Sequence, residues 1–178
     1  MPTELATLAG GCFWCIESVF NRIRGVESAV SGYMGGHTLN PGYKDICRGD
    51  TGHAEVVQVR FNPDEIAYRD ILEIFFALHD PTQKNRQGND VGTQYRSAIF
   101  YHTPEQQREA LSFIAALEAG QAWTGPIVTE VVAADVFYPA EDYHQGYFDA
   151  NPEQGYCRLV VAPKVMKARA KFGSRFKA

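Results

Sequence analysis

The sequence predicts an α+β fold in one domain, because segments with strand periodicity alternate with segments with helical periodicity along the chain. Within residues 55–61, apolar and polar side chains alternate, as in a strand with one buried face. Within residues 13–24, Ile16, Val19 and Ile23 follow the spacing of one helix face. The length of 178 residues corresponds to about one domain and is sufficient to bury a core.

The first six expected elements follow the order β-α-β-β-α-β. This order is typical of the split βαβ, or ferredoxin-like, two-layer sandwich, in which helices cover one face of an antiparallel sheet. The elements are a strand at 5–9, a helix at 13–24, strands at 26–33 and 55–61, a helix from about 64 to 79, and a strand at 95–101.

Three more elements are expected after these six. Thr103 and Gln106 form a capping box with a proline between them, and Gly120 marks the end of the helix that they begin. A strand at 127–137 and a short helix at 140–150 follow.

The expected core therefore covers about 5–150, and a coil-rich, mobile segment covers about 151–178. A glycine-rich stretch that includes Gly35 and Gly42, and a polar stretch at 82–93, are expected to be long loops. Long loops without regular structure in a small domain are usually functional. The functional site is therefore expected at these loops.

Composition and charge narrow the class of protein. Lys and Arg number 17 and Asp and Glu number 21, so the formal net charge is −4. This balance argues against a nucleic-acid binder, which needs a basic face. No apolar run approaches the roughly 18 residues of a membrane helix, and the N-terminus lacks a basic export signal. We therefore expect a cytoplasmic protein, and nothing in the sequence indicates an oligomer, so a monomer is expected.

Two cysteines lie at the first strand-to-helix junction. Cys12 follows a pair of glycines at the expected helix start, where free backbone N–H groups and the helix dipole favour a thiolate. Cys15 is one helical turn further on, within reach of a disulfide to Cys12. This pattern favours redox or nucleophilic chemistry. The alternatives are a zinc site that also uses Cys47, and an inert thiol in the core; zinc is disfavoured because no second metal-ligand pair has suitable spacing.

A carboxyl group is the second candidate. By strand parity, Glu55 points to the same side as Val57, Val59 and Phe61, which is the apolar face. Desolvation raises the pKa of a carboxyl, and a protonated Glu can donate a proton at neutral pH. The alternative is that Glu55 lies just before the strand and in solvent.

Further candidates lie in or next to the long loops. Tyr43 and Tyr95 carry neutral O–H donors that can bind a polar oxygen, and Asp90 is close to Tyr95 in sequence; all three could also simply pack on the surface. Phe13 and Trp14 follow Cys12 and are either core residues or the walls of an apolar pocket. Without metal-ligand spacing, four histidines are interpreted as structural: His53, His79, His102 and His144.

Seven motifs, spread over residues 5–157, give the chain a family resemblance. The motifs are Gly11-Cys12-Phe13-Trp14, Ser31 to Gly36, Asn40 to Tyr43, Gly49 to Glu55, His79-Asp80-Pro81, Gln87 to Ser97, and Ala140 to Gln145. In order and spacing they resemble the class A peptide methionine sulfoxide reductases. The resemblance implies reduction of the S epimer of methionine sulfoxide, free or in proteins, and hence repair of oxidative damage. It implies no bound cofactor, with thioredoxin as reductant and dithiothreitol as its substitute in vitro.

The resemblance also implies residue roles. Cys12 attacks the sulfoxide sulfur and becomes a sulfenic acid. Glu55 is the proton donor to the sulfoxide oxygen, and Tyr43 and Tyr95 surround that oxygen. Three other residues are implied in substrate binding: Phe13 and Trp14 around the methyl group, and Asp90 through hydrogen bonds.

A second cysteine must condense with the sulfenic acid, and the chain offers two candidates. Gly155-Tyr156-Cys157 matches the usual family position of the resolving thiol, whereas Cys15 replaces the glycine that commonly follows Phe-Trp in the family. We expect Cys157 to act before Cys15, because its segment is expected to be mobile. Cys47 is interpreted as a packing residue.

Two other functions remain as alternatives to the reductase. A general thiol–disulfide oxidoreductase is supported by Cys12 and Cys15 alone, and its activity would not need Glu55. A non-catalytic zinc-binding module would contain stoichiometric metal. Both alternatives differ from the reductase in the residues that they need, because sulfoxide reduction needs both Cys12 and Glu55.

Overall fold

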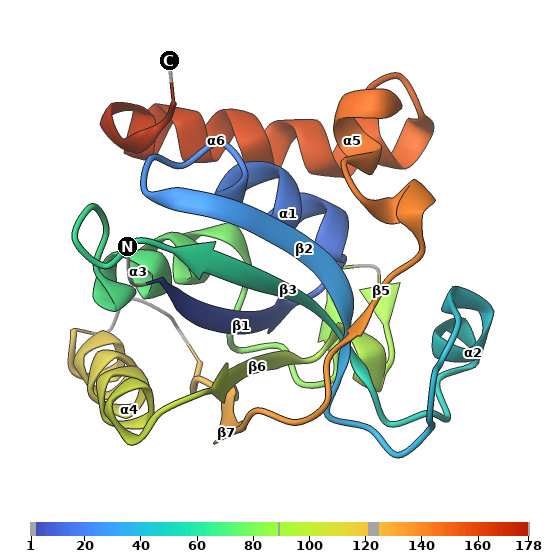
Figure 1. The fold of residues 1–178 in the computed structure, drawn as a ribbon, viewed down its shortest axis with the longest axis horizontal. Helices are drawn as coiled ribbons and strands as arrows, with labels where there is room; N and C mark the ends of the chain where they lie inside the picture. Colours follow the sequence, from blue (N-terminus) through green and yellow to red (C-terminus); the bar gives the residue numbers. More distant parts are fainter. Residues whose placement is uncertain (1–2, 89, 121–124, 178) are drawn as a thin grey trace.

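A six-stranded mixed sheet forms the centre of the structure (Figure 1). The computed structural model describes residues 3–88, 90–120 and 125–177. The strand order is β7-β6-β1-β3-β2-β8, and neighbouring strands are antiparallel except β6 and β7, which are parallel. With helices packed on this sheet, the fold is α+β. The strands are β1 (Glu4–Gly10), β2 (Val26–Met34), β3 (Ala54–Phe61), β6 (Ser97–Tyr101), β7 (Glu130–Ala133) and β8 (Tyr138–Pro139).

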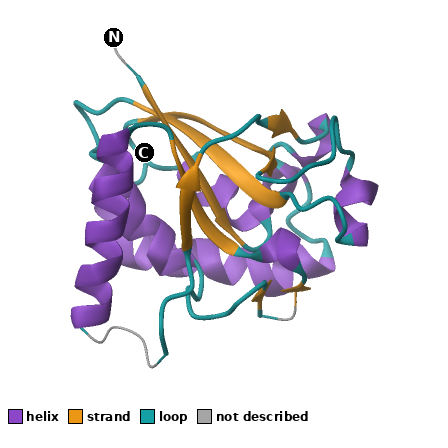
Figure 2. Cartoon of the chain, turned by 90° about the horizontal axis from the view of Figure 1, so that it is seen from below, coloured by secondary structure: helices purple, strands orange, loops and turns teal. Residues whose placement is uncertain are grey.

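Helices gather mainly on one side of the sheet (Figure 2). Apolar residues of β3 alternate between the two faces: Val57 and Val59 belong to the main core with α1, and Val56 belongs to a smaller cluster on the other face. Among the described residues, no helix is both long and apolar enough to cross a bilayer. The helices are α1 (Phe13–Phe20), α2 (Tyr43–Arg48), α3 (Tyr68–Leu78), α4 (Pro104–Ala119), α5 (Tyr147–Ala150) and α6 (Ala162–Phe172).

Short elements connect these helices and strands. A two-stranded hairpin of β4 (Arg86–Gln87) and β5 (Asp90–Val91) lies in the second predicted loop. The 3-10 helices are η1 (Thr93–Tyr95), η2 (Asp142–His144) and η4 (Gly173–Arg175), and a π-helical turn, η3 (Cys157–Val161), begins the C-terminal helix.

Most of the predicted elements are confirmed, with shifted ends. The helix predicted at 13–24 ends at Phe20. The strand predicted at 127–137 is wrong over most of its length, since only Glu130–Ala133 pairs with β6. The helix predicted at 140–150 is broken at Gly146, whose φ of +66° does not continue a right-handed helix. Helix α2 was not predicted within the glycine-rich loop.

The prediction of a coil-rich C-terminal segment is wrong. Residues 157–175 are helical almost throughout, and α6 packs against α1 and α3. Val161, Val165, Ala168 and Phe172 are spaced by four, three and four residues and are all buried. This helical apolar stripe was present in the sequence, and its burial fixes the segment.

Candidate active site

Cys12 lies where β1 ends and α1 begins. Gly10 is the last residue of β1, Cys12 is the N-cap of α1, and its side chain is half-buried. Gly11 between them has a φ of +93°, and a Cβ there would lie 2.8 Å from the side chain of Gln87. Glycine at this position therefore permits both the turn and the close approach of the hairpin that ends near Asp90.

The thiols of Cys12 and Cys15 are in hydrogen-bond contact. Burial raises the pKa of the Cys12 thiol well above its usual value, and the contact with Cys15 and the charge of Glu55 raise it further, against a lowering contribution from the Trp14 N–H. The hydrogen bond from Cys12 lowers the pKa of the Cys15 thiol. The prediction that the helix start favours a Cys12 thiolate is therefore wrong, because burial disfavours the charged form and is the largest cause of the raised pKa of Cys12.

Glu55 lies on β3 directly against the start of α1. Its side chain is 2% exposed, and the Phe13 N–H donates to Oε1 at 3.2 Å. The parity prediction is confirmed, since Glu55 faces α1. Burial raises the pKa of Glu55 to about 8, although the Phe13 N–H lowers it. The carboxyl therefore carries a proton at neutral pH. It lies close enough to Cys12 for its charge to contribute to the raised pKa of that thiol.

Two phenols lie near this carboxyl. Burial raises the pKa of both Tyr43 and Tyr95, and the charge of Glu55 is the next largest cause for each. Tyr43 begins α2 and Tyr95 ends η1, so the two predicted loops bring both side chains to Glu55. Both phenols remain protonated and can donate hydrogen bonds to an oxygen next to the carboxyl.

An aromatic wall extends from Trp14. Its ring stacks on Tyr147 with a centroid distance of 4.0 Å and an interplanar angle of 9°, and it meets Tyr156 edge-on at 5.8 Å. Its indole N–H donates to His144 Nδ1 at 3.1 Å. Phe13 is buried and lies 5.2 Å from the His144 ring. Both aromatic residues after Cys12 thus take part in one cluster.

Asp90 joins the site through the C-terminal segment. The Tyr156 O–H donates to Asp90 Oδ2 at 2.6 Å. The charge of Asp90 also contributes to the raised pKa of Glu55, which places this carboxylate near the proton donor. Of the motif around Asp90, Asn89 lies outside the described residues.

The two remaining thiols differ from expectation. Cys157 is fully buried in the main core, and burial followed by the charge of Cys15 raises the pKa of its thiol. Among the other thiols, Cys15 is the one whose charge contributes to the raised pKa of Cys157. The interpretation of Cys47 as a packing residue is wrong: it is exposed on α2 and its thiol contacts Tyr43.

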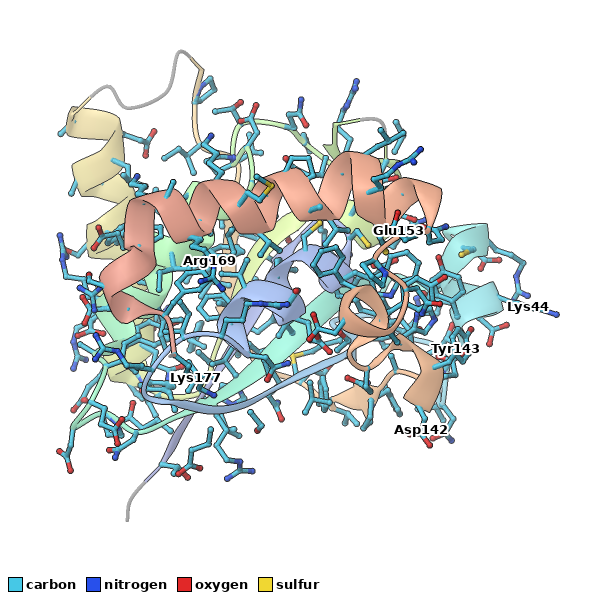
Figure 3. All side chains as sticks on the ribbon, turned by 90° about the horizontal axis from the view of Figure 1, so that it is seen from above. Lys44, Asp142, Tyr143, Glu153, Arg169 and Lys177 are labelled. Atoms are coloured by element: carbon cyan, nitrogen blue, oxygen red, sulfur yellow. The ribbon has the colours of Figure 1, made fainter. Side chains whose placement is uncertain are left out.

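Several site residues were not predicted as functional. His144, interpreted as structural, lies at the centre of the aromatic wall, with Nε2 buried and without a hydrogen-bond partner. Glu141 accepts hydrogen bonds from the Tyr33 O–H and the Tyr43 N–H at 3.0 and 2.8 Å. Figure 3 shows Tyr143 beside the short helix α2 that carries Lys44. The signal available in the sequence was the density of aromatic residues between 138 and 156.

No metal site is found in the part of the chain that the structure describes. No group of three or more His, Cys, Asp or Glu side chains there is arranged to hold a metal ion. The other histidines that were interpreted as structural have protein partners. His79 contacts Ser97 Oγ at 2.7 Å and the Phe75 carbonyl at 2.9 Å, and His102 contacts Thr7 Oγ1 at 2.8 Å.

Together the fold and the site define a thiol-dependent oxidoreductase. A cysteine at a helix start faces a protonated carboxyl and two phenols, and a second thiol touches the first. An apolar aromatic wall lies next to this polar group.

Comparison with known proteins identifies the family. The sequence matches the model of the family described as "Peptide methionine sulfoxide reductase" over residues 4–176. "Peptide methionine sulfoxide reductase MsrA" of Ralstonia nicotianae is 56% identical over 179 residues, covering 98% of this chain and 94% of that protein. The chain belongs to the peptide methionine sulfoxide reductase family.

Solved structures agree with this assignment. The crystal structure of Mxr1 from Saccharomyces cerevisiae in reduced form is 38% identical, with a TM-score of 0.80, and the match covers 87% of this chain and 89% of Mxr1. Mxr1 in complex with Trx2 is 27% identical in its aligned part, with a TM-score of 0.56 and coverage of 82% and 84%.

Proposed function

We propose that this protein reduces the S epimer of methionine sulfoxide, free or in proteins, to methionine, and thereby repairs oxidative damage. The observation that carries the proposal is the buried Glu55 carboxyl, whose pKa of about 8 keeps its proton at neutral pH beside Cys12. A simple dithiol–disulfide exchange does not need such an acid, whereas the oxygen of a sulfoxide must be protonated before it leaves sulfur.

In the proposed first step, the sulfoxide oxygen accepts the proton of Glu55 and hydrogen bonds from Tyr43 and Tyr95. The Cys12 sulfur attacks the sulfoxide sulfur, and its proton passes to Cys15, whose pKa the hydrogen bond between the thiols lowers. The oxygen is transferred to Cys12, which becomes a sulfenic acid, and methionine leaves. Cys12 is oxidised by two electrons, and the substrate sulfur is reduced by two.

We propose that the aromatic wall binds the rest of the substrate. Phe13 and Trp14 follow Cys12 directly and offer apolar surface for the methyl group. Asp90, held by the Tyr156 hydroxyl at 2.6 Å, offers an acceptor for a backbone or amino N–H of the substrate.

We further propose that Cys15, rather than Cys157, forms the first disulfide with Cys12. Cys15 touches Cys12, and the Cys15 N–H donates to the Cys12 carbonyl at 3.3 Å, so the two residues lie across one helical turn. The sulfenic acid and the Cys15 thiol condense to a disulfide and water. Cys157 was expected to act first because it matches the usual family position of the resolving thiol and because its segment was expected to be mobile; Cys157 is instead packed in the main core.

Cys157 is then the second resolving thiol. It attacks the Cys15 sulfur, forms a Cys15–Cys157 disulfide and releases the Cys12 thiol. We propose thioredoxin as the dithiol that reduces this disulfide, with dithiothreitol as its substitute in vitro. The complex of yeast Mxr1 with Trx2 supports this choice of partner.

One assay tests the reductase against its alternatives. With dithiothreitol and a dabsylated S-sulfoxide, Cys12→Ser is expected to abolish reduction. Glu55→Gln is expected to slow the sulfoxide step about 10³-fold, because the general acid is lost. A Glu55→Gln variant with wild-type rate would instead favour a general thiol–disulfide oxidoreductase, and stoichiometric metal after purification would favour a zinc module.

We propose the ferredoxin-like sandwich as the description of the core, supported by the antiparallel order β6-β1-β3-β2. We also propose one domain that acts as a cytoplasmic monomer without a prosthetic cofactor and without nucleic-acid or membrane partners. The thiols that the proposed cycle needs in reduced form support a reducing compartment.

A further inference from the structure

Glu17 is a buried carboxylate that the proposed reaction does not use. It lies on α1, one helical turn beyond Phe13 and Trp14, and is 4% exposed. Its Oε1 accepts a hydrogen bond from the Gly146 N–H at 2.5 Å. Burial raises the pKa of Glu17, against the lowering effects of the Gly146 N–H and Asn21. Burial of a carboxylate is unfavourable unless it is hydrogen-bonded, and Glu17 is hydrogen-bonded to the distant backbone of Gly146. We therefore ask what this contact does.

The contact ends next to the aromatic wall. Gly146 has a φ of +66° and is the N-cap of α5, whose first residue is Tyr147. The Tyr147 ring is the one that stacks on Trp14 at 4.0 Å. Helix α1 therefore contributes the Trp14 ring to the stacked pair. Through Glu17 it also binds the backbone directly before Tyr147, which contributes the other ring.

Other contacts of this segment act elsewhere. Gln145 binds the backbone of Ser31 in β2, which fixes the segment against the sheet. Arg22 pairs with Asp149 at 2.5 Å, but Asp149 is largely exposed, and exposed pairs contribute little. Gln145 directly precedes Gly146 but binds β2, and Asp149 lies two residues after Tyr147; the Gly146 N–H itself is bound by Glu17 of α1.

We propose that Glu17 is a positioning residue for sulfoxide binding: it holds Tyr147 against Trp14, so that the aromatic wall is formed before the substrate arrives. This inference rests on the function proposed above. Preorganisation of a wall lowers the ordering cost of binding and leaves the chemical step unchanged. The expected signature is therefore a change in the apparent dissociation constant of the substrate without a change in the maximal rate of the sulfoxide step.

The test is single-turnover methionine formation at increasing concentrations of a peptide sulfoxide, in wild type and in variants of Glu17, Asp149 and Tyr147. Glu17→Asp keeps the charge but withdraws the oxygen from Gly146, and it is expected to raise the apparent dissociation constant about tenfold, as for one lost buried hydrogen bond. Glu17→Gln keeps an acceptor at the same reach and is expected to restore binding toward wild type. Asp149→Asn, the matched control on the same helix, is expected to change binding less than twofold.

Tyr147→Ala completes a double-mutant cycle with Glu17→Asp. If Glu17 acts through Tyr147, the second substitution adds little to the first, whereas a general loss of stability would give additive effects. Additive effects, or a Glu17→Asp variant that binds like wild type, would overturn the proposal. A wild-type protein without sulfoxide reduction would instead overturn the proposed function, so the two failures are distinguishable.

Discussion

The two ends of the site are built in different ways. Cys12, Cys15 and Glu55 lie on or next to α1 and β3, so each side chain is placed by regular backbone, and Cys15 belongs to the main core. Residues 140–156, which carry Tyr147 and Tyr156 of the aromatic wall, contain only short helical turns and are held by side-chain hydrogen bonds to distant elements, such as Gln145 to Ser31. The proposed reactive atoms are therefore placed by regular secondary structure, whereas the proposed substrate-binding wall depends on a few long-range contacts.

The order of the resolving thiols gives the largest expected effect after the function assay. In a Cys47→Ser background without reductant, the chain with its other three thiols is expected to form two methionines per molecule, because transfer to Cys157 frees Cys12. Cys157→Ser is expected to form one methionine and close the Cys12–Cys15 disulfide. Cys15→Ser is expected to slow disulfide formation by about 10², since Cys157 lacks the contact that gives proximity.

Peptide mapping and dimedone labelling check this order. The sulfenic acid of Cys12 should accumulate in Cys15→Ser and not in Cys157→Ser. Rapid formation of a Cys12–Cys157 disulfide in Cys15→Ser would refute the order and would show that the two regions exchange thiols directly.

The pH dependence of the single-turnover rate should come from Cys15 and Glu55 and not from the aromatic wall. The single-turnover rate is expected to rise with deprotonation of Cys15 and to fall above about pH 8, where Glu55 loses its proton. At pH 9 the rate should be about tenfold below its maximum, since about one carboxyl in ten remains protonated. The decrease of the rate above about pH 8 should be absent in Glu55→Gln and unchanged in Tyr147→Ala. A decrease that shifts to another pH in Tyr147→Ala would show that the aromatic wall also affects the protonation of Glu55.

The raised pKa of Glu55 also predicts how the free energy of unfolding changes with pH. Because the pKa of Glu55 is raised on folding, its contribution to stability is fully present below the unfolded pKa of about 4.3 and is lost as pH rises through about 8. Urea unfolding of wild type and Glu55→Gln should therefore converge toward acid pH, with the variant relatively more stable at pH 9.

The smallest expected effect concerns the other end. Tyr156→Phe removes the hydrogen bond to Asp90 and leaves the ring against Trp14. We expect a rise of about fivefold in the apparent dissociation constant of the substrate, as for one partly exposed hydrogen bond, with the maximal rate unchanged. A loss of maximal rate of the same size would show that Asp90 acts on the reacting group through Glu55.

The sequence predicted the α1 end better than the wall. Strand parity identified the buried face of Glu55, and the Gly-Gly-Cys pattern located Cys12 at a helix start, because both depend on local backbone. It did not identify His144 or Tyr147, whose partners, Trp14 among them, lie about 130 residues away. The sign of the Cys12 pKa change was also missed, because desolvation depends on tertiary packing.

Burial of Cys157 has a kinetic consequence. Its side chain is 0% exposed, whereas residues 151–155 just before it are exposed, and the turn is tied by Gln154, whose Oε1 accepts from the Cys157 N–H at 3.0 Å. In the proposed cycle, an external dithiol could reach the Cys15–Cys157 disulfide only when this turn unwinds. At high reductant concentration, the maximal turnover rate is then set by how often this turn of residues 151–157 unwinds. The maximal rate would therefore be the same for different dithiols.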